Sequence, residues 1–357
     1  MIPSYAYTYI KIGFLKKLIM DQDSLNRLEE LDEIEKFVEF VTPFYPDFSI
    51  DEYTIEQIEG ELYNSYINVV GQIIVYSPDT MRSLLKRYLL KFEIRNIKQA
   101  VIDTILGTPL KQKRKNININ VEELLDKEEF MNELVEIHSL DEIQLFMRDT
   151  QYEKAIREGI LYFRKNNEIF VLEAFLDKIY YDRMANLNVD LNRKEKKLIK
   201  PYLSLVVEIY NLNTIYRGII NEIEKELLKQ FIVDHHLFLE NDMIQTLLYK
   251  NSQSAFFAEL KNFFNTEAEE LKGLFDERKL EEKNFEDYVK RLYYSYYFNK
   301  FKQVQIDDID LLTILRIIEV ILKKKREIES YILPKVVKIL HHKYYSLKDQ
   351  ISNEDFE

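Results

Sequence analysis

The sequence contains no cysteine, which excludes disulfides, thiolate zinc sites and thiol nucleophiles and is typical of a reducing compartment. Histidine is also scarce, with 5 in 357 residues, so little metal chemistry is available. The 7 glycines and 7 prolines are few for a fold rich in tight turns. Because 46% of the residues are hydrophobic and Leu, Ile, Glu and Lys predominate, the composition predicts an all-α fold.

The sequence also lacks a basic charge excess and a long apolar run. Fifty basic against 62 acidic side chains give a net charge of -12, so we expect no nucleic-acid partner, because polyanion binding needs a basic face. The apolar stretch 309–322 is interrupted by three charged residues and is shorter than the roughly 20 residues that span a bilayer. Three lysines spread through residues 5–20 argue against a signal peptide, so this stretch should remain on the mature protein.

Motifs for nucleotide binding and catalysis are absent from the sequence. It contains no Gly-rich phosphate loop, nucleophile elbow or Rossmann fingerprint. The pairs His235-His236 and His341-His342 are poor metal sites, because neighbouring side chains on a helix point about 100 degrees apart. We therefore expect no catalytic residue, cofactor or metal. Three basic runs, 111–115, 193–200 and 323–326, are expected to be solvated faces. Contact of one of them with anionic headgroups or an acidic partner is the alternative.

An all-α metal-dependent enzyme is the catalytic alternative. Asp307, Asp308 and Asp310 are similar to the acidic motifs with which prenyl-transfer enzymes hold magnesium and diphosphate. Such an enzyme needs a second acidic motif on a facing helix, and the sequence offers none. Carboxylates at a helix start, where they meet the positive end of the helix dipole, are the favoured interpretation.

One motif, apolar-Glu-x-x-apolar-x-x-x-Tyr, occurs three times. Its glutamates are separated by 114 and then 113 residues, which indicates a threefold internal duplication. The two apolar positions lie four apart and the Tyr four further on, so they share one helix face. We call this motif block one; its copies are Glu59 with Tyr66, Glu173 with Tyr180, and Glu286 with Tyr293.

A second motif, block two, follows each copy of block one by 34, 35 and 41 residues. Each repeat is therefore at least a helical hairpin, and we predict three similar bundles at 1–115, 116–233 and 234–357. Gly107, Pro109 and the basic run after them mark the first boundary. The key residues of block two are Glu93 and Asn96, Glu208 and Asn211, and Glu327 with Ser330.

These repeated polar residues are interpreted as structural contacts or interface positions. A carboxylate cluster formed by the block-one glutamates is the less favoured alternative, because a duplicated residue is more simply a copied contact. Asn96 and Asn211 stand among apolar residues and are predicted to be buried amides bonded to the backbone of a neighbouring element. Direct contact with a partner is the alternative role for both.

Local signals predict several helix boundaries. Ser77-Pro78-Asp79 should separate two helices, and Asn120 with Glu123 should begin another. A further helix should begin at Asp307 or Asp308. Pro334 should end or kink the helix that contains it.

The two blocks resemble the C subunit of archaeal-type and bacterial V-type ATPases, which is called the d subunit in the eukaryotic enzyme. Residues 172–181 are similar to that family's Glu-x-x-Leu-Asp-x-x-Tyr segment. Residues 208–218 are similar to its Glu-x-x-Asn-Leu segment, which closes in an Arg-Gly turn at Arg217. The chain departs from the family pattern at Asp103, Val336, Ser330 and Pro334.

The resemblance implies three helical bundles arranged as a funnel, with no catalytic activity. It implies that the funnel receives the D and F subunits of the central stalk and sits on the membrane rotor ring of c or K subunits. The protein would then lie at the cytoplasmic face of the membrane, touching it only peripherally through the ring, and couple ATP hydrolysis or synthesis to ion transport. A free-standing helical adaptor is the remaining alternative.

Overall fold

The computed structural model describes residues 4–187, 191–266, 268–272, 274–276, 285–302 and 308–341. Within these ranges the chain forms helices and no strand, so the all-α prediction is confirmed. The residues separate into two compact units. Unit 1 consists of Met1–Lys86, Arg114–Met131 and Asp308–Glu357, and unit 2 consists of Arg87–Lys113 and Asn132–Asp307. The threefold division of the sequence remains a prediction.

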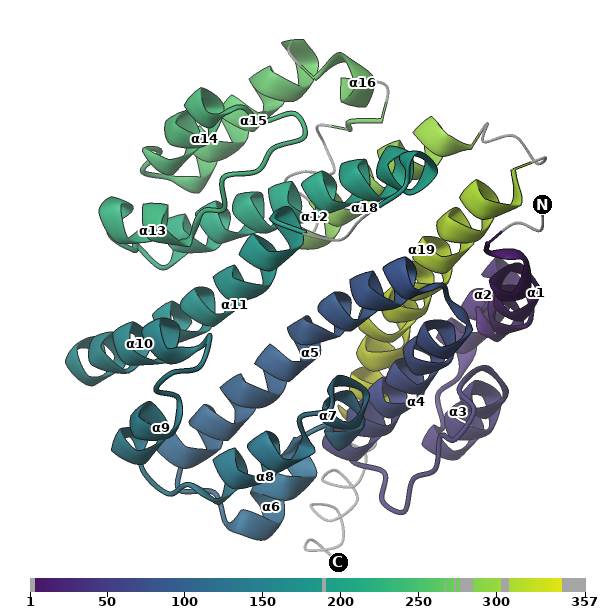
Figure 1. The fold of residues 1–357 in the computed structure, drawn as a ribbon, viewed down its shortest axis with the longest axis horizontal. Helices are drawn as coiled ribbons and strands as arrows, with labels where there is room; N and C mark the ends of the chain where they lie inside the picture. The colour runs from purple at the N-terminus through teal and green to yellow at the C-terminus, as the bar shows by residue number, and fades with distance from the viewer. Residues whose placement is uncertain are drawn as a thin grey trace, which may run out of the picture. The chain divides into compact units, whose positions relative to one another are not determined.

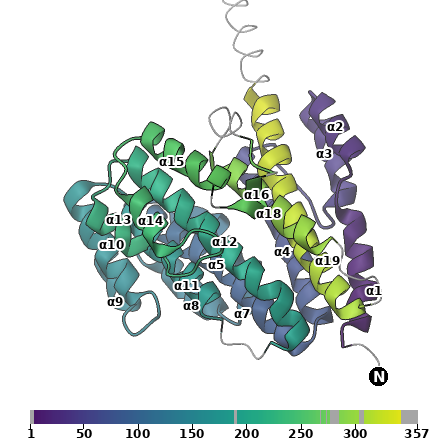
Figure 2. The same cartoon turned by 90° about the horizontal axis from the view of Figure 1, so that it is seen from above.

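In unit 1 an N-terminal helix packs against a C-terminal helix. Helix α1 packs along α19 and α4, and Figures 1 and 2 both show the purple α1 beside the yellow α19. The backbone amide of Tyr5 donates to Asp310 at 3.1 Å, and the Lys16 ammonium pairs with Glu319 at 3.1 Å. The helices assigned wholly to this unit are α1 (Ala6–Leu15), η1 (Lys16–Leu18), α2 (Gln22–Glu30), α3 (Ile34–Val41), η2 (Thr42–Phe44), α4 (Ile55–Tyr76), α7 (Ile119–Leu125), α19 (Ile309–Glu327) and η3 (Ile328–Ile332).

Unit 2 is organised around the 28-residue helix α12 (Arg193–Ile220), which packs against α11, α13, α15 and α18. Figure 1 shows α12 among these helices in teal and green. The other helices assigned wholly to this unit are α9 (Leu140–Phe146), α10 (Glu153–Asn166), α11 (Phe170–Ala185), α13 (Lys225–Phe231), α14 (Asn241–Leu248), α15 (Gln253–Thr266), α16 (Glu269–Lys272) and α18 (Phe285–Phe301). Three helices contribute to both units: α5 (Asp79–Ile105), α6 (Leu110–Asn116) and α8 (Glu128–Glu136).

Helix starts follow the capping chemistry of the sequence. The Asn192 side chain accepts from the amide of Glu195, whose carboxylate accepts in return from the amide of Asn192, so a capping box begins α12. Asp308 caps α19 through the amide of Leu311, as predicted from the sequence. The break at residues 77–79 also lies between α4 and α5 as predicted.

Two boundary predictions need correction. Helix α7 follows Asn118, not Asn120, so Asn120 lies in its first turn. Pro334 does not end its helix: after α19 the chain passes through a π-helical turn, η3 (Ile328–Ile332), and remains helical to residue 341. A π-turn shifts the backbone hydrogen-bonding pattern locally, which lets the helix continue past a proline that cannot donate.

The ends of α5 and α12 have the same geometry at equivalent sequence positions. Each helix closes with a left-handed residue 14 positions after its block-two glutamate, Gly107 in one case and Glu222 in the other. The next amide bonds back across the turn at 2.9 Å, from Thr108 to Asp103 and from Ile223 to Gly218. This is the Schellman closure of a helix, here at matching places in two copies.

The basic side chains of the run 193–200 are exposed, as predicted, but each of the other two basic runs contains one buried lysine, which corrects the prediction there. Lys113 and Lys324 are 2% and 1% exposed. The Lys113 ammonium donates to the Ile137 carbonyl at 2.7 Å and to the Thr104 hydroxyl at 2.8 Å. A buried ammonium is tolerated only with such partners. None of the described helices combines the length and apolarity that a bilayer span requires.

Candidate functional site

The structure places the repeated polar residues on long helices, except Ser330, which lies in the π-helical turn η3. Block one lies on α4, α11 and α18, and block two lies on α5, on α12 and at the end of α19. The two sets differ in burial. The block-one glutamates, Glu59, Glu173 and Glu286, are half-buried. The block-two residues Glu93, Asn96, Glu208, Asn211 and Glu327 are all at most 3% exposed.

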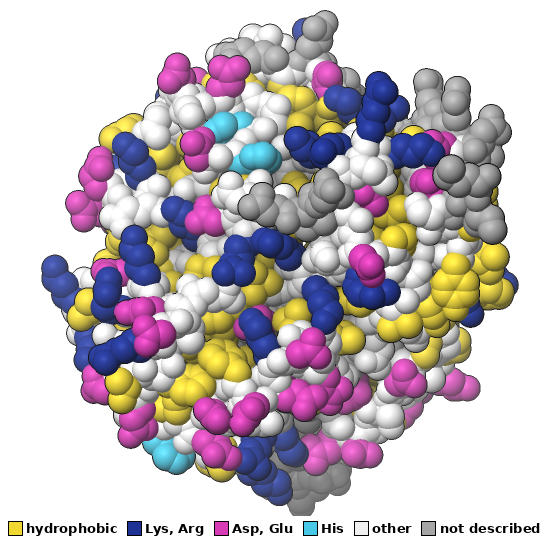
Figure 3. All heavy atoms as spheres, in the orientation of Figure 1, with side chains coloured by type: hydrophobic (Ala, Val, Ile, Leu, Met, Phe, Trp, Pro, Cys, Tyr) yellow, Lys and Arg dark blue, Asp and Glu magenta, His cyan; other side chains and the backbone are white. Residues whose placement is uncertain are grey.

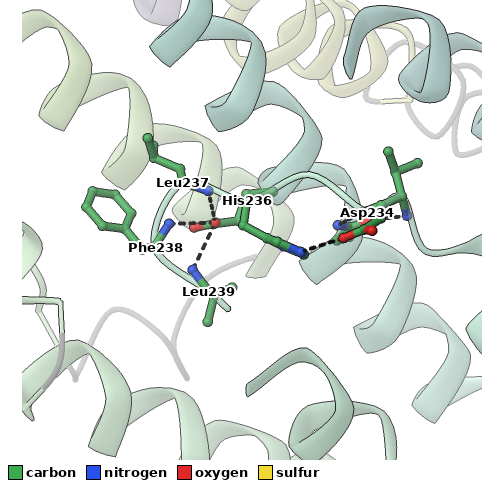
Figure 4. Close-up of polar contacts among 8 residues, drawn as sticks. Asp234, His236, Leu237, Phe238 and Leu239 are labelled. Atoms are coloured by element: carbon green, nitrogen blue, oxygen red, sulfur yellow. Dashed lines mark hydrogen bonds and ion pairs between the residues drawn. The ribbon is translucent and has the colours of Figure 1, made fainter. Parts of the chain in front are cut away.

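The Glu208 carboxylate on α12 holds a turn of backbone between α13 and α14. One of its oxygens, Oε2, accepts from the amides of Leu237, Phe238 and Leu239 at 2.6, 2.8 and 3.0 Å. Figure 4 shows these three labelled amides converging on a single oxygen. Because a buried carboxylate is costly without charge-assisted partners, this turn and Glu208 stabilise each other.

Two neighbours of Glu208 extend the same contact. The Tyr210 hydroxyl donates to the carbonyl of Phe231 at 3.0 Å. Asn211 makes a reciprocal pair with Val233, donating to its carbonyl at 2.8 Å and accepting from its amide at 3.0 Å. Asn211 therefore satisfies both backbone groups of a buried residue, as expected of a structural amide. Block two of this copy binds one loop along its length.

The other oxygen of Glu208 links α12 to the next copy of block one. The hydroxyl of Tyr293 on α18 donates to Oε1 at 2.6 Å, and both residues are fully buried. Burial raises the pKa of Tyr293 well above its usual range, and the Glu208 charge adds to this effect. The matching Tyr66 on α4 donates to the Ile321 carbonyl of α19 at 3.4 Å. In both cases a block-one tyrosine contacts the block-two helix of another copy.

Glu327 plays a corresponding part in unit 1. Its carboxylate accepts from the Met20 amide at 2.7 Å, from the Tyr45 hydroxyl at 3.2 Å and from the Lys324 ammonium at 3.0 Å. Met20 follows η1 at the N-terminal end of the chain, 307 residues away in sequence. The block-two glutamate of the last copy thus anchors the first segment of the chain.

Lys324 completes this buried network. Its ammonium also donates to the Leu18 carbonyl at 2.7 Å and lies 3.4 Å from the centre of the Tyr45 ring. Burial lowers the pKa of Lys324 to about 8, against the opposing effect of Glu327. Burial likewise raises the pKa of Glu327, and Lys324 counteracts it. The pair is a buried ion pair whose remaining hydrogen-bonding groups meet backbone, the arrangement in which such pairs are tolerated.

Arg217 binds one block-one glutamate, Glu286, and feels the charge of a second, Glu173. Its guanidinium forms a two-pronged ion pair with Glu286, with the second contact at 2.8 Å. This hydrogen bonding raises the pKa of Arg217, and the charges of Asp177 and Glu173 raise it further. Asp177 is itself paired with Lys98 at 2.7 Å. The result is a mixed charge cluster over α11, α12 and α18.

Several important residues did not stand out in the sequence. Tyr45, Met20 and the 237–239 turn carry no repeated motif, and their contacts with block two depend on tertiary folding. Tyr293 was recognised as a repeated position without a role. Lys324 had a local signal, because it stands three residues before Glu327 on one helix face.

The candidate metal-site residues have other partners. His235 lies 2.8 Å from the Ser204 hydroxyl, and His236 pairs with Asp234 at 3.1 Å, as Figure 4 shows for the second pair. Asp308 caps a helix and Asp310 accepts from the Tyr5 amide, whereas Asp307 and His342 lie outside the described residues. Among the residues placed in the structure, no group of three His, Asp or Glu could hold a metal ion.

These features define a class of helical protein in which carboxylate and amide side chains of a recurring motif hold neighbouring backbone segments by hydrogen bonds. Comparison with protein families gives the match expected from the motifs. The model of the ATP synthase (C/AC39) subunit family matches residues 11–352. The chain therefore belongs to this family of ATP synthase subunits.

Curated relatives agree with that assignment. The chain is similar to the A-type ATP synthase C subunit of Methanocaldococcus jannaschii, with 24% identity over 241 residues, 64% of this chain and 57% of the relative. The Pyrococcus furiosus C subunit is 24% identical over 234 residues, 64% of this chain and 60% of the relative. The match to the Methanosarcina acetivorans C subunit, also 24% identical, covers 69% and 68%. The matched segment thus spans less than two thirds of the first two relatives.

Proposed function

We propose that this protein is a non-catalytic central-stalk subunit of a rotary ATPase. In this role it receives the D and F subunits of the stalk and sits on the membrane ring of c or K subunits. It lies peripherally at the cytoplasmic face and couples ATP hydrolysis or synthesis to ion transport. The observation that carries the proposal is the family match over residues 11–352. The three copies of the repeat form the funnel of this proposal.

The buried anchors support a mechanical role. A subunit that transmits torque must resist local unfolding, and local stability depends on buried contacts that hold backbone segments in place. Glu208 does this within unit 2 with four hydrogen bonds. Glu327 ties the N-terminal segment to the C-terminal helix within unit 1. Both glutamates accept their hydrogen bonds from groups of the protein itself, as expected of residues with a structural role.

The mixed surface charge also suits contact with several protein partners. On the face drawn in Figure 3, acidic and basic side chains are interspersed, with hydrophobic groups between them. Interspersed charges favour specific pairing with complementary protein surfaces over uniform attraction to one polyanion.

Reconstitution tests the coupling role. Membranes from a strain that lacks this protein should retain ATP hydrolysis by the detached head but lose ATP-driven ion pumping. Adding the purified chain should restore pumping, whereas heat-denatured chain should not. ATP hydrolysis measured in the same samples is the internal control. Normal pumping without the protein would contradict the coupling role and favour an adaptor outside the rotor.

A further inference from the structure

Helix α1 is apolar on its outer face as well as on the side that packs into unit 1. Tyr7, Ile10 and Phe14 are 57%, 60% and 61% exposed. Their spacing of three and four residues places them on one face of the helix. A surface helix ordinarily presents polar residues there, and a contiguous exposed apolar set indicates a surface that something else covers.

The apolar surface continues onto the end of α4. Val75 is 68% exposed, and the ring of Tyr76 meets that of Tyr7 edge to face at 5.8 Å. In Figure 3 a group of hydrophobic side chains lies at the right of the molecule, where Figure 1 places α1. The apolar patch is thus formed by two helices of unit 1, α1 and α4, which hold its side chains in fixed positions.

The charged side chains that α1 and η1 themselves carry are all basic, whereas the acidic groups near them come from other elements: Asp310 and Glu319 on α19 and Asp79 at the start of α5. Residues 4–20 contain three lysines and no Asp or Glu, in a chain of net charge -12. Lys16 is paired with Glu319, but Lys11 and Lys17 lie against the rings of the patch. The Lys11 ammonium is 5.4 Å from the Tyr7 ring, and that of Lys17 is 5.6 Å from the Phe14 ring. A basic and aromatic surface on an acidic protein is complementary to an anionic partner.

We propose that this α1 face, formed by Tyr7, Ile10, Lys11 and Phe14 of α1 together with Lys17 of η1, binds the surface of a bilayer that contains anionic phospholipid. Aromatic rings beside lysines are the side chains that settle at a membrane interface, where the rings enter the headgroup region and the ammonium groups meet phosphate. The 10 residues of α1 are too few to cross a bilayer, so the helix lies flat. Direct lipid contact goes beyond the proposed function, in which the ring mediates the only membrane contact.

Lipid is favoured over an acidic protein helix by the form of the patch. It offers apolar tips and flexible ammonium groups on a convex helix, without an ordered set of hydrogen-bonding groups. A fluid array of phosphates and acyl chains can adapt to such a surface, whereas a specific protein partner is normally held by a defined polar rim.

The absence of tryptophan from the chain gives a direct test. The variant Phe14→Trp carries a single fluorophore on the α1 face, and Leu145→Trp carries one on α9 at a site that is 60% exposed. Each full-length variant is mixed with phosphatidylcholine vesicles with and without phosphatidylglycerol. With anionic vesicles, emission of the position-14 fluorophore should shift to shorter wavelength and be quenched by brominated acyl chains. Emission at position 145 should not change.

Further variants test the contribution of charge. Lys11→Gln and Lys17→Gln should each lower the vesicle partition coefficient about fivefold, and added salt should lower it further. Ile10→Asp should abolish partitioning, with its thermal melt showing that the chain still folds. No binding to anionic vesicles, or an equal response at positions 14 and 145, would overturn the proposal. So would a position-14 response that needs purified stalk or ring proteins and never occurs with lipid alone.

Discussion

The hydroxyl of Tyr293 lies 2.6 Å from Oε1 of Glu208, and the two residues belong to the two recurring motifs, Tyr293 to block one and Glu208 to block two. The same carboxylate holds three consecutive backbone amides through its other oxygen. One buried side chain therefore joins helix α12, the 237–239 turn and helix α18. Such a junction should control the stability of unit 2, because no water reaches it to replace a lost partner.

Removing the Glu208 carboxylate should be strongly destabilising. Glu208→Ala leaves the amides of residues 237–239 and the Tyr293 hydroxyl without their acceptor, which should cost about 3–5 kcal/mol of unfolding free energy. Tyr293→Phe removes a single hydrogen bond and should cost about 1–2 kcal/mol. Urea unfolding followed by circular dichroism measures both changes.

The double variant separates this pair from its surroundings. Once Glu208 is absent, Tyr293→Phe should cost less than it does in the parent, a coupling of about 1 kcal/mol. Tyr53→Phe, at a tyrosine that is 44% exposed, is the matched control and should change stability little. Strict additivity at Glu208 and Tyr293 would show that their contact does not contribute to stability.

Substitutions of Asn211 can distinguish a structural role of this residue from a role in binding a partner. Asn211→Leu removes both partners of the Val233 backbone and should lower the unfolding free energy by about 1–3 kcal/mol. Asn211→Asp keeps the acceptor for the Val233 amide but places an acidic oxygen against its carbonyl, so this variant should recover stability at lower pH. Asn166→Leu, at an exposed position, serves as the control. Normal stability of Asn211→Leu combined with loss of stalk binding would support the partner-contact role instead.

Local sequence signals predicted the helical class and many helix starts. Low Gly and Pro content indicated helices, and Asp308 was recognised as the start of α19 because capping depends on residues within one turn. The repeated spacing likewise identified Glu208 and Glu327 as positions of interest. Helix periodicity reports which residues share a face, so it can nominate a buried residue without reference to its partners.

The partners themselves could not be predicted. Glu208 binds amides about 30 residues further on, and Glu327 binds an amide 307 residues away. Backbone amides carry no residue-specific signal, so nothing at Met20 or Phe238 distinguishes it as a ligand of a carboxylate. Burial of Lys113 and Lys324 was also missed, because basic runs are ordinarily solvated and their carbonyl partners arise only from tertiary contacts.

Three helical glycines should respond differently to the same substitution. Gly60→Ala should stabilise the protein by about 0.5–1 kcal/mol, because a new Cβ meets nothing within 4 Å and alanine favours the helix. Gly159→Ala should destabilise it by about 1–3 kcal/mol, because the Cβ would lie 2.8 Å from the Leu172 Cα. At Gly218 the three atoms nearest to a new Cβ all belong to the Leu228 side chain.

A second substitution distinguishes the two crowded glycines. Leu228→Ala should relieve part of the cost of Gly218→Ala, because the obstructing atoms are those it removes. Leu172→Ala should relieve much less of the cost of Gly159→Ala, because the backbone of residue 172 remains in place. Thermal melts of the single and double variants measure these couplings, and equal relief at both sites would contradict the close helix approach at Gly159.

Buried tyrosines should make the protein sensitive to alkaline pH. Burial raises the pKa of Tyr45, Tyr202, Tyr210, Tyr293 and Tyr297. The unfolded chain loses these protons near pH 10 while the folded chain keeps them. The contribution of these tyrosines to the free energy of unfolding is therefore fully present below about pH 10. It is lost as pH rises toward the folded-state pKa values, by about 1.4 kcal/mol per tyrosine for each pH unit. Lys324 acts oppositely between about pH 8 and 10.5, since its lowered pKa makes stability rise with pH there.

With several tyrosines acting together, we expect cooperative unfolding between about pH 10 and 11. The 25 tyrosines and the absence of tryptophan allow ionisation to be followed by near-ultraviolet absorbance alongside helicity by circular dichroism. Exposed tyrosines should titrate gradually, and the five buried tyrosines should ionise together in one step that coincides with loss of helicity. Tyr202→Phe removes one buried hydroxyl and should move the midpoint to higher pH, whereas Tyr53→Phe should leave it unchanged. If all tyrosines ionise gradually while the helicity remains intact, the five rings are accessible to hydroxide in the folded protein and their burial does not govern its stability.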